Sequence, residues 1–121
     1  MKKAVIILGH GSRSAGADDA VRKLAAEVRK NGGYEITEYA FLQFMQPSLQ
    51  EALDNCIGHG AEKIIIIPFF LQPGTHVMKD VPAYLARAKK QHPGIDIVVT
   101  DFVGSHPLML TIVLDLIEKN K

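Results

Sequence analysis

Four short apolar runs, rich in β-branched residues, alternate along this chain with segments of helical period. The runs are AVIIL (4–8), YEITEYAFL (34–42), KIIIIPFF (63–70) and IDIVVTDF (95–102). The first and third are continuous, which predicts strands that are buried on both faces of a sheet. The second alternates with polar residues and the fourth begins near a charge, so we expect both to lie closer to a sheet edge.

Apolar residues recur at spacings of three and four between and after these runs, as they do in amphipathic helices. The helical segments cover residues 17–28, 49–57, 78–91 and 109–117. Two proline-containing stretches predict where helices start, because proline is tolerated in a first helical turn. They are Pro47-Ser48 and Asp80-Val81-Pro82.

The resulting order is β-α-β-α-β-α-β-α with short connections, and this order predicts an α/β fold. We expect a three-layer arrangement, in which a four-stranded parallel sheet of order 2-1-3-4 carries helices on both faces. Residues 1–121 are expected to form a single domain. Ligands of such open sheets bind beyond the carboxyl ends of the strands, where the strand order reverses. Here that point lies between the first and third strands.

Composition and charge narrow the classes of function. The 121 residues are 47% apolar and 22% charged, with a formal net charge of +1. This balance is globular and gives no strong field for nucleic acid or an anionic membrane surface. No stretch approaches the ~20 apolar residues that cross a bilayer, and the run at 4–8 is too short for a signal peptide. The single cysteine, Cys56, excludes an internal disulfide and fits a reducing cytoplasm.

Two histidines follow the strands that flank the expected switch point. His10 ends the first strand within GHGS, and His76 lies in the long connection PFFLQPGTHVMKD after the third. Each alone is compatible with an ordinary turn or loop histidine, but together they are predicted to meet at the crevice. Neutral imidazoles bind zinc, cobalt, nickel and ferrous iron well. Two protein nitrogens leave most coordination positions open, so such a metal would be transferable.

The surroundings of this pair indicate a bulky anionic ligand. Phe69, Phe70 and Leu71 follow the buried third strand and provide an apolar wall, with one phenylalanine expected in the core. Ser12 and Arg13 are expected at a helix N-terminus, where they could bind a carboxylate or phosphate. Neither a Walker loop nor a dinucleotide-binding glycine motif is present. The ligand we expect is therefore flat, carboxylated and able to bind metal.

Four motifs resemble those of a known family. GHGSR, FLQFMQPSLQEAL, PFFLQPGTHVMKDVP and GSHP follow the four strands in order, between residues 5 and 107. Together they are similar to the small sirohydrochlorin chelatases, the class II chelatases that insert cobalt, nickel or ferrous iron into sirohydrochlorin. The resemblance implies a chelatase-like fold, insertion without ATP, no tightly bound cofactor and pairing as a homodimer.

The resemblance also assigns roles to residues. It makes His10 the metal ligand that accepts a pyrrole proton, and His76 the second metal ligand. A neutral histidine near pH 7 is a reasonable base for that step. The carboxylates of the tetrapyrrole would meet Ser12 and Arg13. The ring would contact one segment of five residues: Leu71, Gln72, Pro73, Gly74 and Thr75.

This sequence departs from the family pattern at two positions after the second strand. Relatives typically have acidic residues there, in LE and EPS, which aid metal delivery or substrate contact. Gln43 and Gln46 occupy those positions here. A glutamine can form hydrogen bonds but cannot take up a proton or offset cationic charge. Either the two histidines suffice, or the metal preference has shifted, or this copy is impaired.

Two other functions compete with metal insertion. A binding protein of the same fold could carry metal or tetrapyrrole without inserting one into the other, and the two glutamines favour that hypothesis. A histidine phosphatase is the third, with GHGSR as a distorted Arg-His-Gly motif. It fails on residue order, because the arginine follows the histidine and no second arginine follows a downstream strand.

Overall fold

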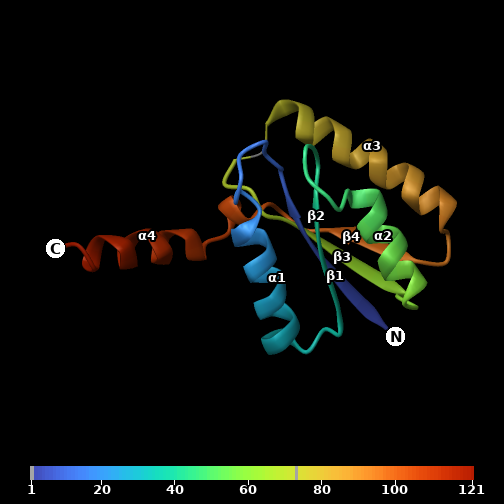
Figure 1. Ribbon diagram of the computed structural model, residues 1–121, viewed down its shortest axis with the longest axis horizontal. Coiled ribbons are helices and arrows are strands. Elements are labelled where there is room, and N and C mark those ends of the chain that lie inside the picture. Colours follow the sequence, from blue (N-terminus) through green and yellow to red (C-terminus); the bar gives the residue numbers. More distant parts are fainter. Residues whose placement is uncertain (1, 73) are drawn as a thin grey trace.

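The computed structural model describes residues 2–72 and 74–121, and the side chains of residues 75–79 lie outside the description. Four strands and four helices alternate (Figure 1). In chain order the elements are β1 (Lys3–Gly9), α1 (Asp19–Gly32), β2 (Ile36–Phe41), α2 (Leu49–Gly58), β3 (Lys63–Pro68), α3 (Thr75–Gln91), β4 (Asp96–Val99), a 3-10 turn (Val103–Ser105) and α4 (Leu108–Glu118).

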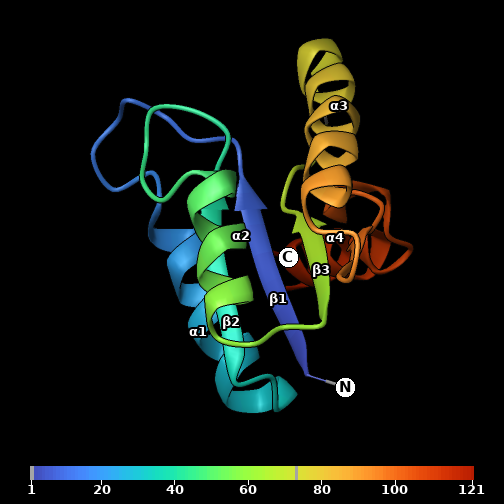
Figure 2. The same ribbon diagram turned by 90° about the vertical axis from the view of Figure 1, so that its right-hand side faces the viewer.

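The strands form one parallel sheet in the order β2-β1-β3-β4, which confirms the predicted topology. The second and fourth apolar runs lie at the two edges, as their patterns indicate. Helix α1 covers one face of the sheet, whereas α2 and α3 cover the other (Figures 1 and 2). The three-layer arrangement with helices on both faces is therefore confirmed.

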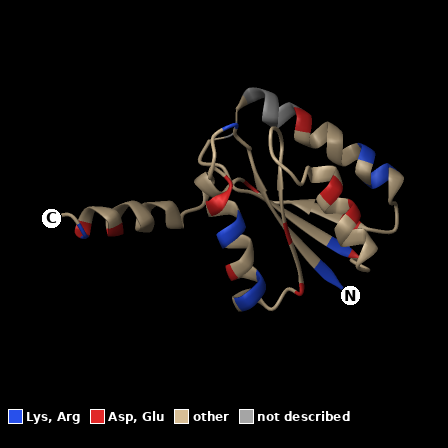
Figure 3. Ribbon diagram, viewed as in Figure 1, with Lys and Arg blue, Asp and Glu red and all other residues tan. Residues whose placement is uncertain are grey.

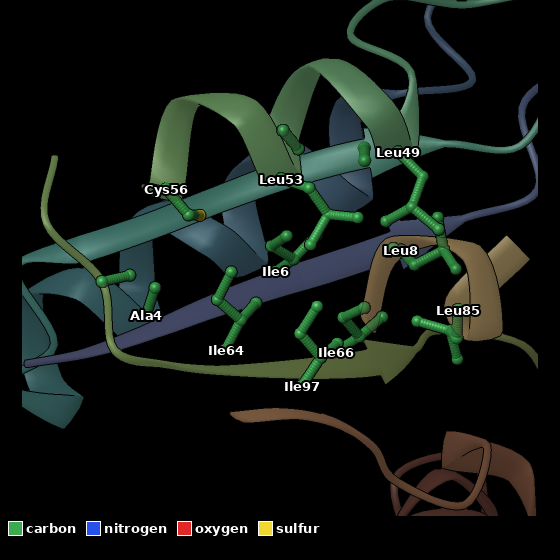
Figure 4. Close-up of a cluster of buried hydrophobic side chains, with 14 of the residues drawn as sticks. Ala4, Ile6, Leu8, Leu49, Leu53, Cys56, Ile64, Ile66, Leu85 and Ile97 are labelled. Carbon is green, nitrogen blue, oxygen red and sulfur yellow. The ribbon is translucent and has the colours of Figure 1, made fainter. Parts of the chain in front are cut away.

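The larger core cluster lies between the sheet and the α2–α3 layer (Figure 4). Alternate residues of β1 and β3 point into it, and Ile6, Leu8, Ile64 and Ile66 have no exposed surface. Burying side chains of this size stabilises a fold by roughly 1.5–3 kcal/mol each. The candidate functional site lies at one end of this packed core.

Helix α2 begins where the sequence predicts. The Ser48 hydroxyl accepts from the Glu51 backbone N–H at 3.2 Å, and the Glu51 carboxylate accepts from the Ser48 N–H at 3.1 Å. This reciprocal pair is a capping box, which satisfies two backbone donors that a helix start leaves unpaired. Pro47-Ser48 is therefore a correct start signal.

Two other predicted helix starts are wrong. Helix α1 begins at Asp19 rather than 17, because the chain first turns through residues 14–18, with Gly16 at a φ of +78°. Helix α3 begins at Thr75 rather than near Asp80, after an extended Gly74, and it continues through Pro82. Proline removes one helical hydrogen bond but does not dictate where a helix starts.

Strand β3 is less buried than its continuous apolar run predicts. Ile64 and Ile66 are buried on the α2–α3 side, whereas Ile65 and Ile67 on the other side are only half-buried. The reason is that α4 points away from the sheet and has no buried residue in the structure (Figures 1 and 2). Among the residues that the structure describes, no helix is both long and apolar enough to cross a membrane.

Candidate active site at the switch point

His10 follows β1 directly and so lies at the carboxyl edge of the sheet, between β2 and β3. Two backbone hydrogen bonds join its loop to the loop after β2. The Leu42 N–H donates to the Gly9 carbonyl at 3.1 Å, and the Gln43 N–H donates to the His10 carbonyl at 3.2 Å. The backbone of His10 is thereby fixed relative to that of Gln43.

Gly11 explains why a glycine follows this histidine. Its φ is +89°, a conformation that side chains with a Cβ rarely adopt. A Cβ at this position would also overlap the backbone carbonyl of Gln43. The close approach of the two loops therefore requires glycine at position 11.

The His10 imidazole lies on the ring of Phe70. The ring centroids are 4.1 Å apart with an interplanar angle of 37°. Phe70 is buried, and the start of its loop is anchored by the Phe69 N–H, which donates to the Leu8 carbonyl at 2.7 Å. Phe70 is the core phenylalanine that the sequence leads us to expect, and its ring limits the orientations open to the imidazole.

The loop after β4 contacts the backbone of Phe70 and Leu71. The Gly104 N–H donates to the Phe70 carbonyl at 2.9 Å, and a Cβ on Gly104 would overlap the Leu71 carbonyl. His106, in the same GSHP motif, accepts at Nδ1 from the Leu108 N–H at 3.1 Å. This motif therefore has a structural role at the start of α4.

A cleft of about 570 Å³ opens beside His10. Gln43 and Leu42 form one wall, and α3 contributes Asp80, Tyr84 and Arg87. The volume lies in the range of small-molecule sites. Sequence reasoning missed these three α3 residues, although their spacings of four and three indicate one helical face.

Tyr84 is held in place within this cleft. Its hydroxyl donates to the Gln50 side-chain oxygen of α2 at 2.6 Å, and the Arg87 guanidinium lies 5.7 Å from its ring centre. Burial raises the pKa of Tyr84, the charge of Asp54 adds to the rise, and Arg87 opposes it. The α3 wall therefore offers a neutral phenol beside a cation.

Ser12 and Arg13 do not lie at a helix N-terminus, and that prediction is wrong because α1 begins at Asp19. The Ser12 hydroxyl accepts from the Ser14 N–H at 3.0 Å within a local turn. The Arg13 guanidinium lies 4.4 Å from the ring centre of Phe44, and both side chains are exposed. Arg13 thus stands on the protein surface, three residues after His10, with its charge accessible to a ligand.

The structure separates the two glutamines. Gln43 lines the cleft with His10. Gln46 instead lies against α2 with its side-chain amide beside the Glu51 carboxylate, and assigning the amide nitrogen to the side that faces Glu51 makes Gln46 the donor of a hydrogen bond. A glutamate at position 46 could not donate this hydrogen bond. Only Gln43 is therefore positioned to replace an acidic group beside His10.

The segment after Phe70 is described in part. Leu71 and Gln72 are exposed, and Gly74 caps α3 and lines the cleft. Pro73 lies outside the described residues, as do the side chains of Thr75 and His76, whose backbone forms the first turn of α3. The pairing of His10 with His76 stays a prediction. Among the described side chains, no three of His, Cys, Asp and Glu gather to hold a metal.

A 2-1-3-4 parallel sheet with an imidazole-lined cleft at its switch point defines an open α/β protein with a candidate ligand site where such folds ordinarily bind their ligands. The family model CbiX matches residues 4–120, so this chain belongs to the CbiX family. The resemblance carried by the four motifs is thereby confirmed.

Three proteins that are similar in sequence or structure are named as sirohydrochlorin chelatases. The chain is 34% identical to a chloroplastic sirohydrochlorin ferrochelatase from Arabidopsis thaliana, over 94% of this chain and 51% of that protein. It is 28% identical to a sirohydrochlorin cobaltochelatase from Methanococcus aeolicus, over 98% of this chain and 99% of that protein. The cobalt complex of the sirohydrochlorin chelatase SirB from Bacillus subtilis subspecies spizizenii superposes with a TM-score of 0.86 at 25% identity, over 98% of this chain and 51% of SirB. The chain thus spans about half the length of two of these proteins and nearly all of the third.

Proposed function

We propose that this chain inserts a divalent metal ion into sirohydrochlorin without ATP, acting as one domain over residues 1–121. The observation that carries the proposal is the His10 imidazole, which lies tilted against the Phe70 ring at the switch point and lines the cleft. Membership of the CbiX family and the activities named for its relatives support the same reaction.

Metal insertion requires the protein to provide metal ligands and a proton acceptor. A divalent metal enters a tetrapyrrole as two pyrrole N–H protons leave, so no redox step or nucleotide is required. In the proposal His10 and His76 bind the incoming metal. As the metal passes to the pyrrole nitrogens, the freed His10 imidazole accepts one of the two protons and solvent takes up the other. An imidazole suits both tasks near neutral pH. Because only two protein nitrogens bind the metal, its affinity for the protein is weak and the metal can transfer to the four pyrrole nitrogens.

Two arginines are candidate partners for the substrate's carboxylates. Arg87 lines the α3 wall of the cleft, and Arg13 is exposed on the surface three residues after His10. Guanidinium groups bind carboxylates through paired hydrogen bonds. We assign the remaining contacts to Ser12, Gln43, Gln46 and residues 71–75, with Gln46 in a supporting role because it lies against Glu51.

We propose cobalt as the metal that is inserted, with nickel and ferrous iron as the alternatives. Relatives are named for cobalt and for iron, and the SirB structure holds cobalt. The product would then belong to cobalamin or sirohaem biosynthesis. We further propose a homodimer in the cytoplasm, although the Arabidopsis relative is chloroplastic.

A carrier that binds metal or tetrapyrrole without joining them is the second candidate function. It is favoured by Gln43, since the cleft beside His10 lacks a carboxylate at that position. A carrier and a chelatase bind the same ligands, so only the rate of insertion separates them.

The test follows the absorbance of sirohydrochlorin with cobalt, nickel and ferrous iron in parallel, with and without the protein. We expect faster insertion for at least one metal and the largest acceleration for cobalt. Binding of the tetrapyrrole with insertion no faster than the protein-free rate, for all three metals, would replace the chelatase by the carrier.

A further inference from the structure

One carboxylate lines the described part of the cleft beside His10, and it belongs to Asp80 of α3. The polar groups that accompany it are the Gln43 amide, the Tyr84 phenol and the Arg87 guanidinium, and the rest of the described lining is apolar. The cleft therefore presents one imidazole and one carboxylate, which come from the loop after β1 and from α3.

The Asp80 carboxylate is accessible to a ligand. Asp80 is exposed, and it has no ion-pair partner among the side chains that the structure describes. Arg87, the cation on the same wall, comes seven residues later, which places it about 10 Å further along the helix axis. The charge of Asp80 is thus not offset by this arginine, and it faces the space where the substrate is proposed to bind.

Asp80 lies near the end of α3 that meets the site. The helix begins directly after Gly74, which lines the same cleft, and the basic residues of its last two turns lie toward the other end (Figure 3). Position 76, which carries the predicted second metal ligand, precedes Asp80 by four residues within the helix. Positions four apart are neighbours on one side of a helix. Asp80 therefore follows the position of His76 by one turn.

An acidic side chain in this cleft opposes a substrate that is itself carboxylated, because like charges at close range repel. A cation that lies between them reverses the sign of this effect. Divalent metals bind imidazole nitrogen together with carboxylate oxygen, and two histidines with one carboxylate are an established ligand set for ferrous iron that leaves positions open. The placement of Asp80 beside His10 is thus explained by a metal ion and not by the tetrapyrrole alone.

We propose that Asp80 is a ligand of the incoming metal, which it binds through a carboxylate oxygen while His10 binds it through an imidazole nitrogen. The α3 helix then supplies the carboxylate that Gln43 cannot supply. This assignment rests on the proposed function, because the metal is the substrate of that reaction. With His76 the protein would offer three ligands, fewer than the four pyrrole nitrogens that receive the metal.

The same assignment gives the substrate an orientation in the cleft. Asp80 attracts the metal near the start of α3, and Arg87 attracts carboxylates two turns away. In a tetrapyrrole the metal binds at the centre of the ring and the carboxylates lie at its periphery. The α3 wall therefore favours a pose in which the ring centre faces Asp80 and a peripheral carboxylate faces Arg87.

The test titrates full-length protein with Co²⁺ alone and measures the affinity by calorimetry. Asp80→Asn keeps the size of the side chain and removes its charge, and it should weaken Co²⁺ binding at least about 10-fold. Asp101→Asn is the matched control, since Asp101 is exposed after β4 and does not line this cleft. That variant should bind Co²⁺ like wild type. Circular dichroism checks that both variants are folded.

A second substitution returns the carboxylate from the opposite wall. The Gln43 backbone is hydrogen-bonded to the His10 carbonyl at 3.2 Å, so Gln43→Glu places an acid beside the same imidazole. We expect the double variant Asp80→Asn, Gln43→Glu to recover Co²⁺ affinity that Asp80→Asn lacks. Wild-type affinity in Asp80→Asn, or an equal loss in Asp101→Asn, would overturn the proposal, because the metal would then not depend on this carboxylate.

The rate of cobalt insertion, measured on the same samples, separates this proposal from the proposed function. Wild type that does not accelerate insertion, with Co²⁺ affinity that depends on Asp80, would support the metal ligand and reject the chelatase. Wild type that accelerates insertion, with Asp80→Asn equal to it in both affinity and rate, would support the chelatase and reject Asp80 as a ligand.

Discussion

Gly11 is the residue on which the geometry of the site depends most directly. It allows the loop that carries His10 to touch the loop that carries Gln43, at a φ of +89°. Both its backbone conformation and the contact exclude a side chain. The glycine in GHG is therefore a structural condition for the position of the histidine.

Gly11→Ala is expected to destabilise the protein by about 2–3 kcal/mol, because the new Cβ meets a backbone carbonyl that cannot move away easily. Urea unfolding measures this change. Gly58→Ala is the matched control, since a Cβ there meets nothing within 4 Å at the end of α2. That variant should be neutral or slightly stabilising. Equal effects at the two positions would contradict the role assigned to Gly11.

The two glutamines should respond differently to an acidic replacement. Gln43→Glu adds a carboxylate to the cleft and should raise metal affinity and the rate of insertion. Gln46→Glu adds one beside Glu51, so it should lower stability by about 1 kcal/mol and leave the metal affinity unchanged. Metal titration and urea unfolding of both variants measure these effects. The opposite assignment, with metal affinity responding only at position 46, would show that Gln46 faces the substrate.

At this scale the sequence predicts His10 and the buried phenylalanine, since both follow buried strands directly. It does not predict that Gln46 lies against Glu51, because that contact depends on how the loop after β2 meets α2. Nor does it predict the α3 wall of the cleft, because the spacing of Asp80, Tyr84 and Arg87 indicates a shared helical face but not that this face turns toward His10.

The packing of α2 against the sheet gives stability a dependence on pH. Cys56 has no exposed surface, and burial, with Glu38 as a smaller contribution, raises its pKa from 9.0 to about 12. The folded state therefore retains the thiol proton that the unfolded chain loses above pH 9. The contribution of the neutral thiol is fully present below pH 9 and is lost as the pH rises toward 12.

We expect the free energy of unfolding to fall by up to roughly 4 kcal/mol from Cys56 alone across that range, at about 1.4 kcal/mol per pH unit. Cys56→Ala removes the titrating group and should show a shallower fall. The comparison is between slopes, because the smaller side chain also lowers stability at every pH. Parallel slopes for the two proteins would mean that α2 does not shield the thiol.

Among the elements, the strand positions follow from the apolar runs, whereas a helix start follows from the sequence only where contacts within the helix's own first turn set it. Ser48 was predicted correctly because its capping box is a local contact within four residues. The start of α1 depends on the turn at Gly16 and that of α3 on the extended backbone of Gly74, and neither follows from the periodic apolar pattern. A helix start that depends on contacts within four residues can therefore be predicted from the sequence, whereas one that depends on the preceding loop cannot.

For the whole molecule, the alternation of strands and helices was sufficient to predict the order β2-β1-β3-β4. The same pattern predicted an amphipathic helix at 109–117 but could not tell which surface it covers. Periodicity identifies an apolar face and is silent on whether that face packs within its own chain or on another. The uncovered sides of β3 and α4 are the part of the fold that sequence reasoning did not foresee.

The central claim is that His10 carries metal insertion, and one comparison tests it most directly. Cobalt insertion into sirohydrochlorin is followed by absorbance for wild type, His10→Ala and His59→Ala. His59 is the control, because it is exposed beyond α2, with Nδ1 2.7 Å from the Asn55 carbonyl oxygen. Loss of a metal ligand and proton acceptor should slow insertion by at least about 100-fold in His10→Ala, with His59→Ala unchanged. A folded His10→Ala protein that inserts cobalt at the wild-type rate would contradict the account.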